Sequence, residues 1–318
     1  MVLISKFVFG PVYSRRLGRS LGVNNVPYKT CSYNCIYCQL GRTTNYSVVR
    51  RCFYPWTDIV RDISDFLRVF KGDVDYVTFV PSGEPTLDSC IGKVVEVIKK
   101  EFNVRVAVLT NASLLWLNDV RSDLTQVDYV SIKVDVVDEG VWRVLNRPHP
   151  TLKLGDILNG IIEFSKEFKG VLTSETMLIH NVNTNVKYYE GITKFLSRLG
   201  LHKVYISIPI RPPAESYVKP PLDIEVIEAY EIFSRVLSPD KVELLNIPEP
   251  LPKAYGDPIT WLLNTVSVHP LRYEYVVKVL EGMSSNPDEI IEKLVKEGLI
   301  VEVEYLGSKY ILKSFKHI

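Results

Sequence analysis

The sequence contains few cysteines and no long apolar run. Both features limit the classes of protein to which the chain can belong. Its 318 residues include five cysteines, while 46% of residues are apolar and 24% are charged. No uninterrupted apolar stretch approaches the roughly 18 residues that a membrane helix needs. Residues 1–9 are apolar but lack a small-residue cleavage site, so no secretory signal is expected. The composition predicts a cytoplasmic globular protein of one large or two unequal domains, without disulfides.

Acidic residues are absent from the first 57 positions, although the whole chain is nearly neutral, with 38 basic and 37 acidic residues. The basic residues of this stretch are Lys6, Arg15, Arg16, Arg19, Lys29, Arg42, Arg50 and Arg51. One interpretation is a surface that binds an anion, whether a carboxylate, a phosphate or RNA. The other is a solvated basic face that acids later in the chain balance.

Strand-length apolar runs alternate with amphipathic helical stretches through the first two thirds of the chain. We expect strands at 21–24, 75–80, 104–110, 128–134, 171–179 and 203–208. Between them, apolar residues such as Ile59, Ile63 and Phe66 recur with helical spacing. This alternation favours an α/β fold with a parallel sheet and helices outside it. Six β/α units, rather than eight, predict a partial barrel with its site at the carboxyl ends of the strands.

Prolines interrupt the pattern after residue 208, first at 209–221 and again at 248–258. A helix at 223–237 and a strand at 242–245 lie between these clusters. The last sixty residues predict helices at 259–266, 272–281 and 287–297, followed by a hairpin at 299–312. We therefore divide the chain into a core domain (1–221), a helix–strand extension with a proline-rich linker (222–256) and a winged-helix-like domain (257–318).

Three of the five cysteines form one motif, in which Cys31, Cys35 and Cys38 are separated by three and two residues. The flanking residues have no helical or strand periodicity, so an irregular loop is expected. Three thiolates leave one iron of a [4Fe–4S] cube without a protein ligand, and a reacting molecule can bind there. Two alternatives stay open: a zinc site with a fourth ligand from Cys52, Cys90 or a histidine, and a cluster for plain electron transfer.

The cysteine motif, with Tyr37 before its last cysteine, resembles that of the radical S-adenosylmethionine (SAM) superfamily. Further matching stretches lie at 10–22, 38–43, 82–87, 145–149 and 211–215, and they resemble the wyosine-synthase-like iron–sulfur oxidoreductases. The resemblance covers about residues 10–221. It implies a partial (β/α)6 barrel, a [4Fe–4S] cluster bound by the three cysteines, and SAM as second cofactor. It also implies reductive cleavage of SAM to a 5′-deoxyadenosyl radical that removes hydrogen from a substrate.

The same resemblance implies which residues contact SAM. Ser82, Gly83 and Glu84 match the motif that receives the methionine amino group, and Gly83 permits close approach of the backbone. Asn111 ends the next strand, and the backbone near Ile208 matches the adenine-contacting end of the last strand. Ser131, Lys133 and Asp135 alternate along the fourth strand, so we expect them on one face of a polar pocket. The alternative for Lys133 and Asp135 is a structural ion pair. Glu175 and Asn183 are expected to face the ribose or the substrate.

The sequence leaves the substrate open. Wyosine-forming relatives act on a tRNA guanine and generally carry further cysteines upstream, whereas Cys31 is the first cysteine here. We expect Cys52 and Cys90 to be buried small residues. The helix at 287–297 carries four acids and two lysines, which favours a protein contact or a substrate lid over duplex binding.

The partners expected are SAM, an electron donor such as a ferredoxin or flavodoxin, and a tRNA or protein substrate, with no membrane. The alternative function is a non-catalytic, metal-stabilised nucleic-acid-binding protein with the winged helix as its reader. Iron analysis after anaerobic reconstitution separates the two, because the first predicts about four irons per chain and the second predicts zinc.

Overall fold

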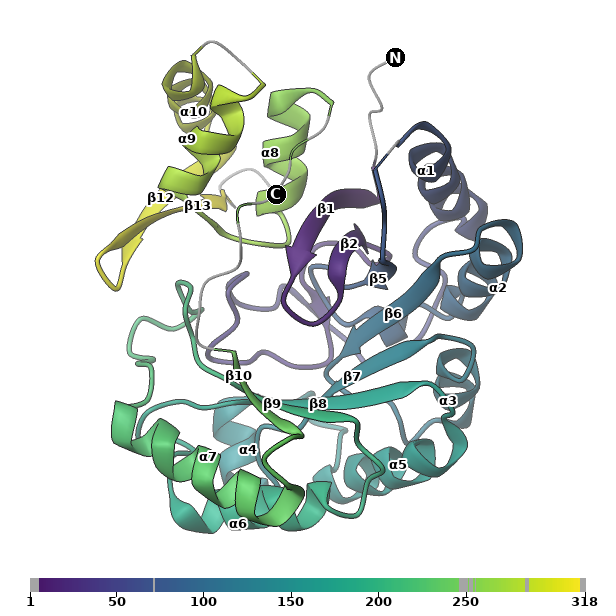
Figure 1. Cartoon of the computed structure of the whole chain (residues 1–318), viewed down its shortest axis with the longest axis vertical. Helices are drawn as coiled ribbons and strands as arrows, with labels where there is room; N and C mark the ends of the chain where they lie inside the picture. The colour runs from purple at the N-terminus through teal and green to yellow at the C-terminus, as the bar shows by residue number, and fades with distance from the viewer. Residues whose placement is uncertain are drawn as a thin grey trace.

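An eight-stranded sheet forms the centre of the computed structural model, which describes residues 6–314 apart from 71, 246–250, 252–253, 255 and 284–285. Its strands, in spatial order, are β1 (Val8–Ser14), β2 (Gly18–Val23), β5 (Tyr76–Phe79), β6 (Arg105–Thr110), β7 (Tyr129–Lys133), β8 (Val171–Met177), β9 (Lys203–Ser207) and β10 (Val242–Leu245). β1 is antiparallel to β2, and every later neighbour is parallel. The predicted partial parallel barrel is thereby confirmed (Figure 1).

Each connection between successive parallel strands carries at least one helix on the outer side of the sheet (Figure 1). These helices are α1 (Trp56–Val69), α2 (Ile91–Glu101), α3 (Asn118–Leu124), α4 (Glu139–Leu145), α5 (Leu154–Glu167), α6 (Val186–Leu196) and α7 (Asp223–Leu237). The predicted apolar face of α1 is buried, with Ile59, Ile63 and Phe66 each at most 9% exposed. Full burial of one such side chain contributes roughly 1.5–3 kcal/mol, and this fixes the helix against the sheet.

The sheet extends beyond the six predicted strands at both edges. β1 was not predicted, because Gly10 and Pro11 interrupt its alternation; a register shift between Phe9 and Val12 accommodates them. At the other edge, β10 pairs in parallel with β9, and Phe233 of α7 joins the main core. The helix–strand extension therefore continues the barrel.

Residues 257–314 form a C-terminal module with a core of its own. It contains α8 (Pro258–Val266), β11 (Leu271–Arg272), α9 (Tyr273–Glu281), α10 (Pro287–Lys296), β12 (Ile300–Tyr305) and β13 (Ser308–Lys313). The Tyr305 and Tyr310 hydroxyls donate to the carbonyls of Pro209 and Ile210, each at 2.8 Å, so the module is tied to the end of β9. The expected helices and hairpin are present, whereas Pro248, Pro250 and Pro252 of the expected linker lie outside the described residues.

Among the described residues, no helix combines the length and the apolar character needed to cross a membrane.

Candidate functional site

A cavity of about 420 Å³ lies at the carboxyl ends of the barrel strands. On its other side it is lined by residues 268–272, Tyr275 and Tyr310 of the C-terminal module, which we call the roof. The structure brings most of the residues assigned from the sequence into this one lining: Cys31, Cys35, Tyr37, Cys38, Gly83, Glu84, Asn111, Ser131, Lys133, Glu175 and Ile208. Ser82, Asp135 and Asn183 are not part of it.

The three cysteines of the motif are free thiols at the cavity wall. Cys31 ends β3 (Thr30–Cys31), which pairs with β4 (Asn45–Tyr46), and the chain from 32 to 44 is irregular, as expected. Each sulfur accepts a hydrogen bond: Cys31 from Asn111 Nδ2 at 3.5 Å, Cys35 from Asn146 Nδ2 at 3.4 Å, and Cys38 from Lys29 Nζ at 3.1 Å. Donors of this kind stabilise the thiolates that a metal requires.

The protonation of the Cys31 and Cys35 thiols depends on whether a metal is bound. Burial raises the pKa of both Cys31 and Cys35 to about 12. Both are therefore protonated at neutral pH without a metal, and cluster binding must release their protons.

The Ser82–Glu84 segment packs directly on the cysteine loop. A Cβ atom at Gly83 would lie 1.9 Å from the carbonyl oxygen of Thr30, so only glycine fits at this contact. The Glu84 amide donates to the same carbonyl at 3.0 Å, and the Lys29 amide donates to the carbonyl of Ser82 at 2.9 Å. Ser82 thus joins the two segments through its backbone, behind the cavity wall.

Glu84 is 1% exposed, and its carboxylate accepts four hydrogen bonds. The donors are the Thr110 hydroxyl at 2.5 Å, the hydroxyl and the amide of Thr86 at 2.6 and 3.1 Å, and the Asn111 amide at 2.8 Å. Burial raises the pKa of Glu84, although these donors oppose the shift. The carboxyl group is therefore fixed in orientation at the cavity wall.

A charge network largely shielded from solvent spans the inner wall, with the side chains of Arg16 and Glu175 15% exposed and that of Lys133 24% exposed. Glu175 forms ion pairs with Arg16 and with Lys133, the latter at 3.2 Å, and Lys133 also lies 3.5 Å from Asp135. Burial disfavours the charged form of Glu175, but Lys133 and Arg16 outweigh it and hold the pKa of that carboxyl well below its usual range. Burial likewise opposes the charge on Lys133, but Asp135 and Glu175 raise the pKa of Lys133. The ammonium group thus keeps its charge in the cavity.

Asp135 and Asn183 support the site from behind. The Asp135 carboxylate is 3% exposed and accepts from the Tyr37 hydroxyl, from Asn146 Nδ2 at 2.8 Å and from the Met177 amide at 2.8 Å. The fully buried Asn183 donates to the carbonyls of Asp135 and Met177. The expectation that Asn183 faces the ribose or the substrate is therefore wrong, because its amide is used to join two loops.

The basic N-terminal stretch is largely balanced by acids from later in the chain. Arg19 pairs with Asp75 at 3.0 Å, Arg42 with Glu215 at 2.8 Å and Arg50 with Asp123 at 2.5 Å. Arg16 of this stretch is not on a solvated face, because it is enclosed with Glu175. Sequence reasoning missed this role because a buried arginine and a surface arginine look alike without their partners.

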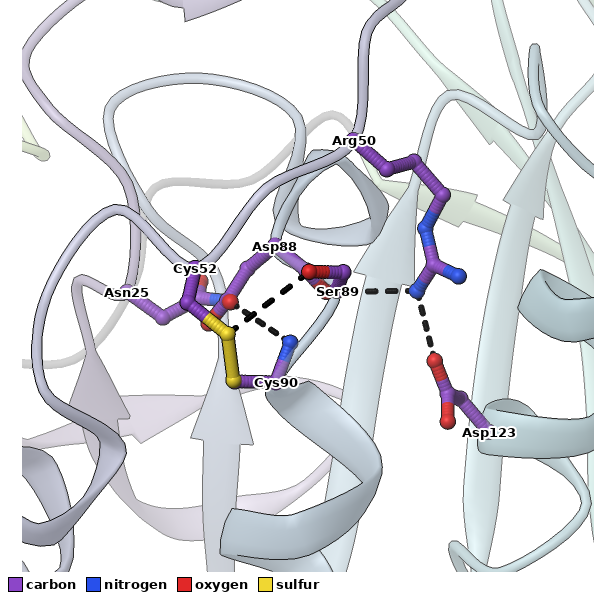
Figure 2. Close-up of a disulfide and its surroundings, with 7 residues drawn as sticks. All are labelled: Asn25, Arg50, Cys52, Asp88, Ser89, Cys90 and Asp123. Atoms are coloured by element: carbon purple, nitrogen blue, oxygen red, sulfur yellow. Dashed lines mark hydrogen bonds and ion pairs between the residues drawn. A yellow bond between two sulfur atoms is a disulfide. The ribbon is translucent and has the colours of Figure 1, made fainter.

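Cys90 is buried as expected, but the expectation that Cys52 is buried and that the chain has no disulfide is wrong. They form a disulfide, and Cys52 is exposed while Cys90 is 4% exposed (Figure 2). Neither residue lines the cavity. A disulfide was not expected because a cytoplasmic location was predicted. The two cysteines are also distant in sequence, so no local pattern indicated that they lie close together.

Comparison with known proteins identifies the family. The model of the Radical SAM superfamily matches residues 25–188, more than half of the chain. The chain belongs to the radical SAM superfamily. The UPF0026 protein MJ1312 of Methanocaldococcus jannaschii is 42% identical over 311 residues, which cover 97% of this chain and 96% of the relative. The UPF0026 protein slr1464 of Synechocystis is 39% identical over 212 residues, 64% of this chain and 76% of that protein.

Among solved structures, a radical SAM methyltransferase from Sphaerobacter thermophilus aligns with a TM-score of 0.54 at 17% identity, covering 71% of this chain and 66% of that one. This likeness concerns the fold alone. Family membership makes the chain a radical SAM iron–sulfur enzyme, with a [4Fe–4S] cluster and SAM as cofactors. The alternative of a non-catalytic nucleic-acid-binding protein is thereby set aside.

Proposed function

We propose that this enzyme abstracts a hydrogen atom from an anionic substrate, with tRNA as the first candidate to test. The proposal is carried by the single cavity, in which the three cysteines, the ends of the barrel strands and an excess of cations meet. When bound, the cluster and SAM supply the 5′-deoxyadenosyl radical for hydrogen abstraction. The chain itself binds, orients and shields these groups.

We assign Cys31, Cys35 and Cys38 as the cluster ligands. All three residues line the same cavity, and each sulfur has its own N–H donor. The two remaining cysteines are bonded to each other outside the cavity, so they do not complete the ligand set. This leaves one iron for SAM.

SAM is best accommodated between the cysteine loop and the strand ends. We assign Gly83 and Glu84 to its amino group and Lys133 to its carboxylate, because Lys133 is charged and lies at the cavity wall. Asn111 and Ser131 line the space between them, and the backbone at Ile208 is available to the adenine. Ser82 and Asp135 act as positioning residues, the latter through Tyr37 and Lys133.

The charge of the cavity supports an anionic substrate. Six lysines and arginines line it against the two carboxylates of Glu84 and Glu175. The inner cations Arg16 and Lys133 contact Glu175, whereas Arg211 and Arg272 belong to the side near the roof. A phosphate or carboxylate is therefore favoured at that side, with the roof as a lid. Reduction of the cluster requires an external donor such as a ferredoxin or flavodoxin.

Fluorescence anisotropy with labelled tRNA at two salt concentrations tests the substrate class. We expect salt-sensitive binding, and Arg272→Gln should weaken it and lower the salt slope by about one unit. Arg68→Gln on the outer helix α1 is the matched control and should leave binding unchanged, because Arg68 is 63% exposed and does not line the cavity. Salt-insensitive binding, or equal effects of the two variants, would contradict the tRNA assignment.

A further inference from the structure

The Cys52–Cys90 disulfide joins the two segments that carry the cofactor residues (Figure 2). Cys52 follows the cysteine loop, while Cys90 lies between Glu84 and α2. Their Cα atoms are 5.2 Å apart, within the 4.4–6.8 Å that disulfides span. The bond therefore joins the chain that follows the cysteine loop to the chain that follows Glu84, outside the cavity.

The two sulfurs differ in accessibility. Cys52 is exposed to solvent, and Cys90 is 4% exposed. A soluble thiol can therefore attack the Cys52 sulfur, with Cys90 as the leaving group. Thiol–disulfide exchange depends on this kind of access.

Several hydrogen bonds connect the disulfide to Glu84. The Arg51 amide donates to the Leu87 carbonyl at 3.0 Å, and the Ser89 amide donates back to the Arg51 carbonyl at 3.2 Å. Between them, the short helix η1 (Pro85–Leu87) begins at Glu84, whose side chain accepts from the Thr86 amide. Residues 84–90 therefore form one segment that the disulfide holds at its far end.

Asp88 and Asn25 fix the middle of this segment. The Asp88 carboxylate is 1% exposed and accepts from the Cys90 amide at 2.9 Å and from Asn25 Nδ2 at 3.1 Å. Asn25 Nδ2 also donates to the Pro85 carbonyl at 3.1 Å. Figure 2 shows Asn25 and Asp88 beside the disulfide.

We propose that Cys52 and Cys90 form a thiol–disulfide exchange site for a dithiol reductant, and that the oxidised form holds the Glu84 segment in place for SAM. One thiolate of the reductant attacks Cys52, the S–S bond breaks, and Cys90 leaves and takes up a proton. The second thiolate of the reductant then releases Cys52, which is also protonated. Two electrons pass to the protein, and the reductant becomes a disulfide. The effect on SAM rests on the proposed function, whereas the exchange site does not.

Metal binding is the competing outcome, because the two sulfurs and an Asp88 oxygen lie within 4.8 Å of one another. We favour the disulfide, since a structural zinc site normally takes four ligands and Asp88 already accepts two hydrogen bonds.

The exchange site is tested by trapping thiols in anaerobic cells with acid and an alkylating agent, followed by peptide mass spectrometry. We expect Cys31, Cys35 and Cys38 to be alkylated at once, and Cys52 and Cys90 only after reduction with dithiothreitol. Immediate alkylation of all five cysteines, or one zinc per chain that is lost in Cys52→Ser with Cys90→Ser, would overturn the proposal.

The coupling to the cofactor site is tested on the reconstituted holoenzyme. Reduction with dithiothreitol should weaken SAM binding by roughly threefold to tenfold, as for a site whose competent state is only partly populated. It should also speed amide hydrogen exchange within residues 84–90. The Cys52→Ser with Cys90→Ser variant should match the reduced protein and no longer respond. If reduction left the amide hydrogen-exchange rates of the wild type unchanged, the coupling would be overturned even if SAM failed to bind. A wild-type response of the double variant to dithiothreitol would also overturn it.

Discussion

The two sides of the cavity differ in how their polar groups are held. On the barrel side, Glu84 is 1% exposed and accepts four hydrogen bonds, and Glu175 is enclosed by two cations. On the roof, the Arg272 side chain is 27% exposed, and its partner Glu274 is 64% exposed. Buried, fully bonded groups keep a fixed geometry for cofactors, whereas half-exposed charges can exchange water for a substrate. We therefore expect the barrel side to bind the cofactors and the roof to influence the choice of substrate.

The largest effect is expected from the cysteines of the barrel side. Replacing any one of Cys31, Cys35 or Cys38 by Ala should abolish cluster binding, because three protein ligands are the minimum for this site. Cys52→Ala and Cys90→Ala are the matched controls and should keep about four irons per chain. Iron and sulfide analysis after anaerobic reconstitution measures this, and loss of iron in Cys52→Ala would refute the ligand assignment.

The second-largest effect is expected from Gly83→Ala. The new Cβ would lie 1.9 Å from the Thr30 carbonyl oxygen, so the SAM segment and the cysteine loop must separate. We expect SAM cleavage to fall by about 100-fold, as for a small misplacement of reacting groups. Gly155→Ala in α5 meets no atom within 4 Å and should leave cleavage unchanged. The cleavage rate is measured from the 5′-deoxyadenosine formed in the presence of dithionite. Equal cleavage rates in the two variants would argue against the packing role of Gly83.

The contrast between the two sides also explains what the sequence could reveal. Periodicity predicted the parallel strands and outer helices, the family motifs pointed to Cys31 and Gly83, and alternation along one strand pointed to Lys133, because local spacing carries that information. The partners of Arg16 and Cys52 were not predictable, since they lie at distant positions that only the fold brings together. A protein contact or a lid was expected of the helix at 287–297, which does not line the cavity, and the roof residues themselves were not predicted.

Glu175→Gln tests the buried charge network. Breaking a buried ion pair should cost about 3–5 kcal/mol of unfolding free energy, because Arg16 and Lys133 keep their charges. Since the pKa of Glu175 is lowered by folding, its stabilisation is complete above the pKa of the unfolded residue, about 4.3, and declines at lower pH. Urea unfolding from pH 7 to pH 3 should show the difference between wild type and variant shrinking below that value. A constant difference would exclude Glu175 as the titrating group.

The smallest effect is expected from the roof. Tyr310→Phe removes a hydrogen bond to the Ile210 carbonyl and should cost about 0.5–1.5 kcal/mol. SAM cleavage without substrate should stay near the wild-type rate, because the barrel holds the cofactor residues. Thermal unfolding and cleavage assays on the same preparation check both parts. A loss of cleavage as large as in Gly83→Ala would remove the distinction between the two sides.

The central claim is that the cluster and SAM meet in this one cavity, and electron paramagnetic resonance of the dithionite-reduced cluster tests it most directly. Adding SAM to the reconstituted wild type should change the g values of the reduced cluster, because SAM binds the iron that lacks a cysteine ligand. Lys133→Met, which removes the proposed partner of the SAM carboxylate, should need more SAM for the same change. A spectrum that stays identical at saturating SAM would contradict the account.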